Sequence, residues 1–364
     1  MFVHRLGKSR DFGTSRMTAL RVGIAGYGVV GKRRGECVKK HPSLELVAVC
    51  DQNLHGRDVT DDGIPCYESL DDLLKCELDV LLVSLSNDLA ATATAAGLAR
   101  GMHVFCEKPP ARRPSELVPV LELERSNPHL RLMYGFNHRY HDSVIRALDI
   151  IRSGELGRII NMRGVYGKAK LITFNQPSWR VEREISGGGV LLDQGIHMVD
   201  IMRLFAGDFV EVSSIVSNGH WGYDVEDNAY ALMKSKDGAV ALFNSSATQW
   251  RHQFSLDINL QRGSLILRGI LTGSKSYGAE TLTIVRADPD NDNGDPIEST
   301  ETFNRDPSWD REIEAFVNAI NSGQAPAHGT STDALETLQL VYKIYHADPV
   351  WRNRYQIETP EIRS

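Results

Sequence analysis

The chain has 364 residues, of which 41% are hydrophobic, a length that favours two domains and a composition that lets each bury a core. Its formal net charge is -6, and the sequence has no basic stripe of the kind that follows a phosphate backbone, which argues against nucleic acid as a partner. No apolar run approaches the ~20 residues of a membrane-spanning helix, and the five cysteines form no C-x-x-C pair, so we expect no membrane partner and a cytoplasmic protein.

Residues 1–18 lack apolar periodicity and predict a flexible arm, with Met17 as an alternative start. Residues 19–137 alternate short apolar runs with helical stretches, which is typical of a doubly wound parallel sheet, the Rossmann arrangement. We expect strands at residues 20–25, 44–50, 80–85, 103–106 and 130–134. Helices are expected at residues 69–76, capped by Ser69, and 88–100.

A glycine-rich turn follows the first expected strand and leads into a helical stretch; its residues are Gly26, Tyr27, Gly28, Val29, Val30 and Gly31. Such a turn lets a dinucleotide pyrophosphate reach the backbone N–H groups at a helix start. Asp51 follows Gly31 by 20 residues, the spacing of an acid that binds the adenosine ribose and would repel a 2′-phosphate. The pattern predicts NAD as cofactor, with NADP possible; a glycine-rich turn without ligand is the alternative.

Lys108 lies in Cys-Glu-Lys-Pro-Pro, residues 106–110, after the fourth expected strand and at the sheet edge where ligands bind in such folds. Pro109 restricts the backbone of Lys108, whose ammonium group could stabilise a developing alkoxide. The alternative is a solvated Glu-Lys pair on the surface.

Residues 138–364 have a different pattern, which predicts an α+β domain with an open, mostly antiparallel sheet for substrate binding and oligomerisation. A helix at 142–152 precedes expected strands at 158–166, 210–216, 228–234, 239–245, 254–260 and 264–267. Asp237-Gly238 predicts a tight hairpin turn. Helices are expected at 309–321 and 332–346, and residues 288–295 as an exposed loop.

Asp193 and His197 follow a glycine run at 187–189 and lie four residues apart, so a helix would place both on one face. A neutral imidazole can remove a hydroxyl proton while a carboxylate orients it or a nearby ammonium, and we expect oxidation to rise with pH between about 6 and 8. Gly195 is unfavourable inside a helix, and close approach of a ligand would explain it. The alternative is a capping Asp with a structural His.

These motifs, in this order, resemble the Gfo/Idh/MocA family of oxidoreductases over nearly the whole chain after Leu20. The resemblance implies Lys108, Asp193 and His197 as the catalytic set, with Asp193 and His197 also contacting substrate. It implies further cofactor contacts at Glu107, Lys108 and Asn137, and substrate contacts at Arg139, Trp179 and Arg180. Residues 83–87, Val-Ser-Leu-Ser-Asn, depart from the family's Thr-Pro-Asn-x-x-His; Ser84 and Asn87 remain candidate cofactor contacts.

The resulting expectation is an NAD(P)-dependent enzyme that moves a hydride between nicotinamide and a secondary alcohol or ketone of a sugar, cyclitol or nucleotide-activated sugar. The resemblance also implies a homodimer or homotetramer through the C-terminal sheet. No metal is expected, because the His138 and His141 pair lacks further ligands. Two alternatives are an NAD-dependent glycosidase with transient oxidation and a non-catalytic NAD-binding regulator.

Overall fold

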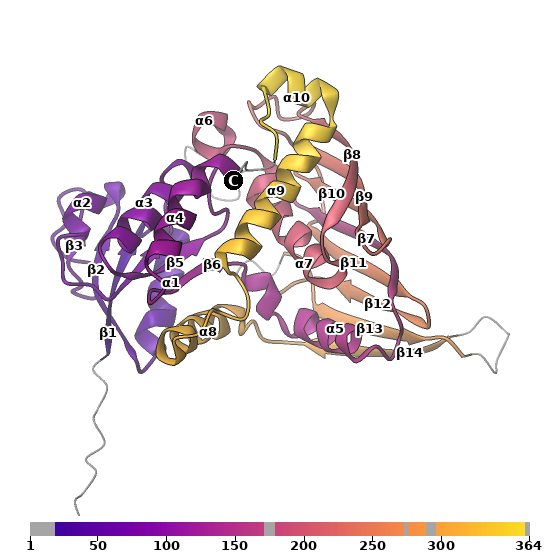
Figure 1. The fold of residues 1–364 in the computed structure, drawn as a ribbon, viewed down its shortest axis with the longest axis horizontal. Helices are drawn as coiled ribbons and strands as arrows, with labels where there is room; N and C mark the ends of the chain where they lie inside the picture. Colours follow the sequence, from indigo (N-terminus) through magenta and orange to yellow (C-terminus); the bar gives the residue numbers. More distant parts are fainter. Residues whose placement is uncertain (1–18, 171–178, 273–275, 289–295, 361–364) are drawn as a thin grey trace, which may run out of the picture.

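A computed structural model describes residues 19–170, 179–272, 276–288 and 296–360. It contains two sheets that lie side by side with helices between them (Figure 1). The expected arm at 1–18 and most of the expected loop at 288–295 lie outside the described residues. Among the described residues, no helix is long and apolar enough to cross a membrane.

The first sheet is parallel throughout and has the strand order β3-β2-β1-β4-β5-β6. Its strands are β1 (Leu20–Ala25), β2 (Leu44–Cys50), β3 (Cys66–Tyr67), β4 (Val80–Val83), β5 (His103–Glu107) and β6 (Leu132–Gly135). Its helices are α1 (Val29–Lys40), α2 (Leu70–Leu73), α3 (Asn87–Ala99) and α4 (Val118–Ser126), with short 3-10 turns at Gln52–Leu54 and Pro114–Leu117. The predicted Rossmann arrangement is therefore confirmed.

Side chains alternate between the two faces of this sheet, because successive residues of a strand point to opposite sides. Val22, Ile24, Val80 and Leu82 share one core with Phe316 of helix α8 (Ser308–Ser322), far along the chain. Ala25, Leu81 and Val83 face a second core that extends through α3 into the other domain. Helix α8, from the part of the chain expected to form the second domain, thus covers one face of the first sheet (Figure 1).

The second sheet has eight strands in the order β14-β13-β12-β11-β7-β10-β9-β8 and is antiparallel except where β10 pairs with β7. Its strands are β7 (Ile159–Gly167), β8 (Phe209–Ser217), β9 (Asn228–Ser235), β10 (Val240–Ser246), β11 (Gln253–Leu260), β12 (Gly263–Arg268), β13 (Glu280–Arg286) and β14 (Ile297–Phe303). The predicted hairpin at Asp237-Gly238 is confirmed, since β9 and β10 pair across it.

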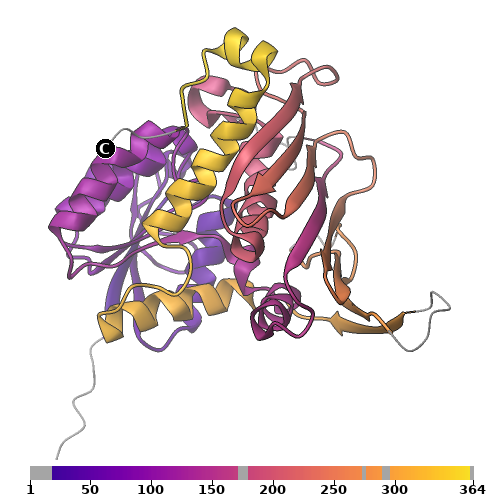
Figure 2. The same cartoon turned by 45° about the vertical axis from the view of Figure 1, so that its right-hand side comes forward.

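Helices cover one face of this second sheet and leave the other without a helix (Figure 2). The helices on the sheet are α5 (Asp142–Ser153), α7 (Ile196–Ala206) and α9 (Ser331–Ala347). The same part of the chain also contains α6 (Arg183–Ser186) beside α3, α10 (Pro349–Tyr355) beside α9, and 3-10 turns at Asn137–Tyr140 and Trp179–Val181. A π-helical segment, Leu191–Gly195, leads directly into α7. Along β9 buried and exposed residues alternate, as expected for a sheet with one open face.

Candidate active site

The glycine turn between β1 and α1 gives each glycine a separate role. Gly26 has φ of 87°, and a side chain there would meet the Ser84 backbone oxygen at 2.4 Å. A side chain on Gly31 would come within 1.9 Å of the Gly26 oxygen, so the helix can approach the strand only with glycine here. Nothing lies within 4 Å of the position that a Cβ would take on Gly28, which begins α1. The turn therefore leaves open space at a helix N-terminus, the geometry that a pyrophosphate requires.

Other residues around this turn also fit a dinucleotide. The Asp51 carboxylate, at the end of β2, accepts hydrogen bonds from the backbone N–H groups of Tyr27 and Asn53, both at 2.9 Å. The Ser84 hydroxyl is buried and has no hydrogen-bond partner, as expected of a group that hydrogen-bonds to a bound ligand. Asn87, in contrast, donates to the Ser186 carbonyl at 2.7 Å and ties α3 to α6.

Lys108 lies just beyond β5 and reaches the π-helical segment in the second domain. Its Nζ donates to the backbone carbonyl of Asp193 at 2.5 Å. Burial lowers the pKa of Lys108, and the negative charges of Asp193 and Glu107 oppose that shift. The preceding Glu107 carboxylate accepts from Arg34 Nε at 2.6 Å. The side chain of Glu107 is thus held by Arg34, and the ammonium group of Lys108 points toward Asp193.

The Asp193 carboxylate lies among positive side chains. Lys168, directly after β7, donates to one oxygen at 3.1 Å, and Arg180 contacts the other at 3.4 Å. Burial alone would raise the pKa of Asp193, but the charges of Lys168, Lys108 and Arg180 outweigh it and hold the pKa well below its usual value. Asp193 is therefore a permanent anion that can orient ammonium groups and cannot act as a base near neutral pH.

His197 is 6% exposed and lies in the first turn of α7. Its ring stacks on that of His138, with centroids 3.8 Å apart and planes 14° from parallel. Burial lowers the pKa of His197 well below 6.5, and the charge of Lys108 lowers it further. Its Nδ1 is buried and has no hydrogen-bond partner. The imidazole is consequently neutral, which is the form that can accept a proton. The rise of the oxidation rate with pH, expected from the sequence between about 6 and 8, should therefore occur below pH 6.5.

His138 links this ring to the interior through two polar contacts. Its Nε2 lies 3.0 Å from the Tyr166 hydroxyl, and its Nδ1 lies 3.2 Å from the Asn137 side-chain oxygen. Burial lowers the pKa of His138 well below 6.5 as well. Within the described residues no three His, Cys, Asp or Glu side chains are grouped closely enough to hold a metal ion. The sequence marks His138 as half of a His138 and His141 pair that lacks further metal ligands, and it does not predict the stacking of His138 on His197.

The remaining candidates divide into two groups. Trp179 lies under the Arg180 guanidinium, 4.4 Å from carbon to ring centroid, so both border Asp193. Arg139 is buried and forms two hydrogen bonds with Asp200, at 2.7 and 2.6 Å, and contacts Asp333 at 3.1 Å. Because these carboxylates hold its guanidinium, Arg139 joins the turn after β6 to α7 and α9 in this structure. Asn137 donates to the Ser308 hydroxyl at 3.1 Å.

Sequence reasoning missed Lys168 and Glu226, whose partners are distant in the sequence. Glu226 is fully buried and accepts from the backbone N–H groups of Gly189 and Leu191, at 2.7 and 2.9 Å. It therefore holds the start of the helical segment that carries Asp193, in place of a cap from the glycine run itself.

The reason for glycine at position 195 differs from the expected one, which was the close approach of a ligand. A Cβ there would meet the Ser245 hydroxyl oxygen at 2.6 Å, so strand β10, and not a ligand, requires glycine.

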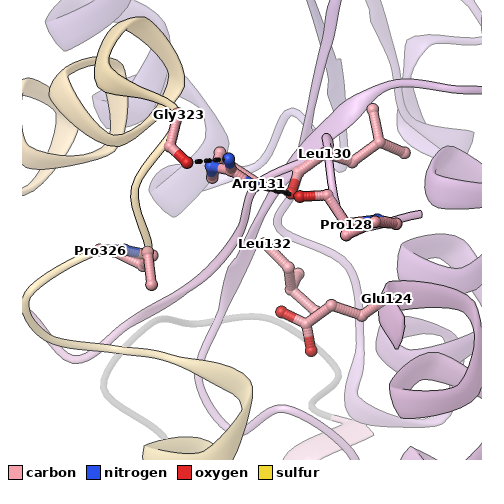
Figure 3. Close-up of a pocket in the computed structure, with 8 residues that line it drawn as sticks. Glu124, Pro128, Leu130, Arg131, Leu132, Gly323 and Pro326 are labelled. Carbon is pink, nitrogen blue, oxygen red and sulfur yellow. Dashed lines mark hydrogen bonds between the residues drawn. The ribbon is translucent and has the colours of Figure 1, made fainter. Parts of the chain in front are cut away.

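A separate pocket lies at the amino end of β6, at the edge of the first sheet opposite to Lys108 (Figure 3). Arg131 donates there to the backbone carbonyls of Pro128, Leu130 and Gly323. Its guanidinium is thus used to join the α4–β6 connection to the end of α8, and the pocket has no part in the site described above.

Comparison with known proteins agrees with this geometry. Residues 20–136 match the oxidoreductase family with an NAD-binding Rossmann fold, and residues 144–266 match the GFO/IDH/MocA C-terminal domain. D-glucoside 3-dehydrogenase of Escherichia coli is 30% identical over 67% of this chain and 76% of its own. Inositol 2-dehydrogenase of Salmonella typhimurium is 24% identical over 86% and 90%. The chain belongs to the Gfo/Idh/MocA family and is an NAD-binding oxidoreductase.

Solved structures share the same fold. Levoglucosan dehydrogenase in complex with NADH and levoglucosan superposes with a TM-score of 0.80, covering 92% of this chain and 98% of its own at 19% identity. Myo-inositol 2-dehydrogenase of Lactobacillus plantarum gives 0.75, covering 92% and 98% at 23% identity.

Proposed function

We propose that this protein is an NAD-dependent dehydrogenase or reductase that acts on a secondary alcohol or ketone of a sugar-like substrate: a sugar, cyclitol or nucleotide-activated sugar. The observation that carries the proposal is the meeting of Lys108, Asp193 and His197 beside the carboxyl edge of a dinucleotide-binding sheet. Curated relatives named for glucosides and inositol support the substrate class.

Bound NAD would supply hydride transfer at this site, and the residues of the chain would handle the proton and the charge on oxygen. His197, neutral because it is buried, takes the hydroxyl proton. Lys108 stabilises the oxyanion that develops through its ammonium group. Asp193, fixed by Lys168 and Arg180, offers its main-chain carbonyl to Lys108 and keeps that ammonium in place.

Cofactor and remaining contacts follow from the same geometry. Gly28 and the start of α1 would hold the pyrophosphate, Asp51 the ribose hydroxyls, and Ser84 would donate its unpaired hydroxyl to the cofactor. We prefer NAD to NADP because Asp51 would repel a 2′-phosphate. Trp179 and Arg180 would border the substrate.

The test is an absorbance assay at 340 nm with free sugars, cyclitols and nucleotide sugars, each with NAD and with NADP. We expect Lys108→Met to lower turnover by roughly a hundredfold or more with cofactor affinity preserved, because the ammonium acts mainly in the transition state. Lys75→Met, on the exposed helix α2 end, is the matched control and should have no effect. Release of an aglycone without net change in NADH would instead favour the glycosidase. Cofactor binding without turnover of any compound would favour the regulator.

A further inference from the structure

Three aromatic side chains form a group at one end of the second sheet, with His220 and Trp250 exposed and Trp221 half-buried; we call these three residues the aromatic platform. The His220 ring meets Trp221 edge-on, with centroids 4.8 Å apart, and meets Trp250 edge-on at 5.9 Å. Trp250 is 74% exposed, the second most exposed among the large apolar side chains of the described residues. An indole this accessible contributes little to a core, so its position calls for another explanation.

The platform is held rigidly despite its exposure. The Trp221 indole N–H donates to the Ala247 carbonyl at 2.8 Å. Asp227, almost completely buried, accepts from the backbone N–H groups of His220 and Trp221 at 2.8 and 3.1 Å. A buried carboxylate is costly unless donors surround it, and here its donors fix an exposed loop. The Trp221 ring and the backbone of His220 are therefore ordered before any ligand arrives, and Trp250 lies against this fixed loop through the His220 ring, which reduces the entropy lost on binding.

The loops that carry the platform also border the proposed active site. Gln249, next to Trp250, donates its backbone N–H to the Lys168 carbonyl at 3.0 Å, and Lys168 pairs with Asp193. On the other loop, Trp221 packs in one cluster with Val181, the neighbour of Arg180. Glu226 of the same loop holds the helical segment that carries Asp193. The platform is thus joined to the surroundings of Asp193 on both sides, through Gln249 and Lys168 on one loop and through Glu226 on the other.

We propose that the aromatic platform is a second subsite, which binds the ring attached to the reacting sugar, so that the preferred substrate is a glycoside and not a free monosaccharide. This inference rests on the proposed function. A pyranose or phenyl ring presents a flat apolar face of C–H groups or π-electrons, and the exposed Trp250 indole offers a matching face beside the fixed Trp221. A free monosaccharide bound at Lys108 and His197 leaves the platform uncovered, whereas a glycoside buries it.

The experiment compares glucose, methyl β-glucoside, phenyl β-glucoside and a glucosyl disaccharide, by initial rates and by calorimetric titration of the NAD-saturated protein. We expect Trp250→Ala to weaken binding and raise KM about tenfold for the phenyl glucoside and disaccharide, with glucose changed less than twofold. Trp250→Phe should recover most of the loss. Val350→Ala, which removes a more exposed large apolar side chain from helix α10, is the control and should not discriminate between these ligands.

The other outcomes distinguish failure of the subsite from failure of the proposed function. Equal effects of Trp250→Ala on glucose and on the glycosides, or no effect on either, would reject the subsite while the oxidoreductase function stood. Trp250-dependent binding of glycosides without turnover would reject the proposed function and retain the subsite. A change only in sedimentation mass would assign the platform to contact with a second copy of the chain.

Discussion

At the scale of single residues, burial shifts two neighbouring bases in directions that serve the proposed chemistry. The low-dielectric surroundings lower the pKa of both Lys108 and His197, because each loses solvation of its charged form. The charge of Lys108 disfavours a second charge on His197. The pair therefore favours one ammonium group beside one neutral imidazole, which is the combination that oxyanion stabilisation and proton removal require.

His138 is expected to act as a positioning residue through its stacked contact with His197. His138→Ala should lower turnover roughly tenfold or more and move the acidic limb of the oxidation rate toward higher pH, since water admitted beside His197 would favour its charged form. His138→Phe keeps a flat ring and should retain the low-pH limb. The measurements are kcat and KM against pH, with His197 titrated by NMR as a readout independent of turnover. An unchanged limb in a well-folded His138→Ala protein would show that the contact is only structural.

Asp51 is expected to set the choice between the two cofactors. Asp51→Ala should weaken NAD roughly tenfold or more and NADP much less, because the carboxylate binds ribose hydroxyls and repels a 2′-phosphate. Asp51 also accepts from Tyr27 and Asn53, so the alanine variant loosens the turn. Asp51→Asn is the control: it keeps an acceptor and removes the charge, and should improve NADP relative to NAD. Fluorescence titration with both cofactors gives the two affinities, and parallel weakening would refute the role.

At the scale of elements, the sequence predicts the bounds of strands and helices best where the apolar periodicity and the residues that begin or end an element agree. β1 and β2 begin and end at the predicted residues, and α5 and α8 differ by single residues at their ends. β13 and β14 were not predicted, because β14 is a largely exposed edge strand of mainly polar residues whose pairing with β13 comes from the sheet. The weak pattern of such a strand resembles a loop.

The candidate site shows the same division at close range. Lys108, Asp193 and His197 belong to recognisable motifs, whereas Lys168 is a single lysine 25 residues from its partner Asp193. Glu226 lies 37 residues from the N–H group of Gly189 that it binds. No local pattern marks such pairs, because only the fold brings them together. The π-helical turn at Asp193 was likewise unpredicted, since its residues have an ordinary helical pattern.

Gly195 separates helix propensity from packing. Propensity alone predicts that Gly195→Ala stabilises the protein by about 1 kcal/mol. The 2.6 Å approach to the Ser245 hydroxyl predicts the opposite, a net loss of roughly 1–3 kcal/mol, with turnover lowered because Asp193 and His197 flank the position. Urea unfolding measures the difference. Ser245→Ala in the same chain should recover part of the loss, since only its Cβ, at 2.8 Å, then remains close. A stabilised Gly195→Ala protein would show that strand β10 moves away to accommodate the added methyl group.

At the scale of the whole molecule, the chain crosses between its two sheets more than once. Helix α8 returns to cover the first sheet, and its Glu312 binds the buried Arg34 of α1, which also binds Glu107 beside Lys108. Arg139 joins Asp200 of α7 to Asp333 of α9. Each half of the proposed site is thus held by its own buried charged network. Hydrogen bonds from Lys108 to the Asp193 carbonyl and from Asn87 to the Ser186 carbonyl join the halves, and we expect relative motion of the sheets to be limited.

The open face of the second sheet is expected to be the contact between copies of the chain. Exposed apolar side chains gather on its neighbouring strands: Leu232 and Leu242 are register partners, Tyr230 is paired with Ile215, and Val240 and Val210 lie nearby. A patch of this kind is costly in water, and an isologous contact would bury it in a dimer. Leu232→Glu with Leu242→Glu places four carboxylates in that contact and should reduce the sedimentation mass to that of one chain. Lys234→Glu, on the same face but at an already charged position, is the control and should leave the mass nearly unchanged. A wild-type protein that sediments as one chain at micromolar concentration would contradict the assignment, and unchanged mass in the double variant would place the contact elsewhere.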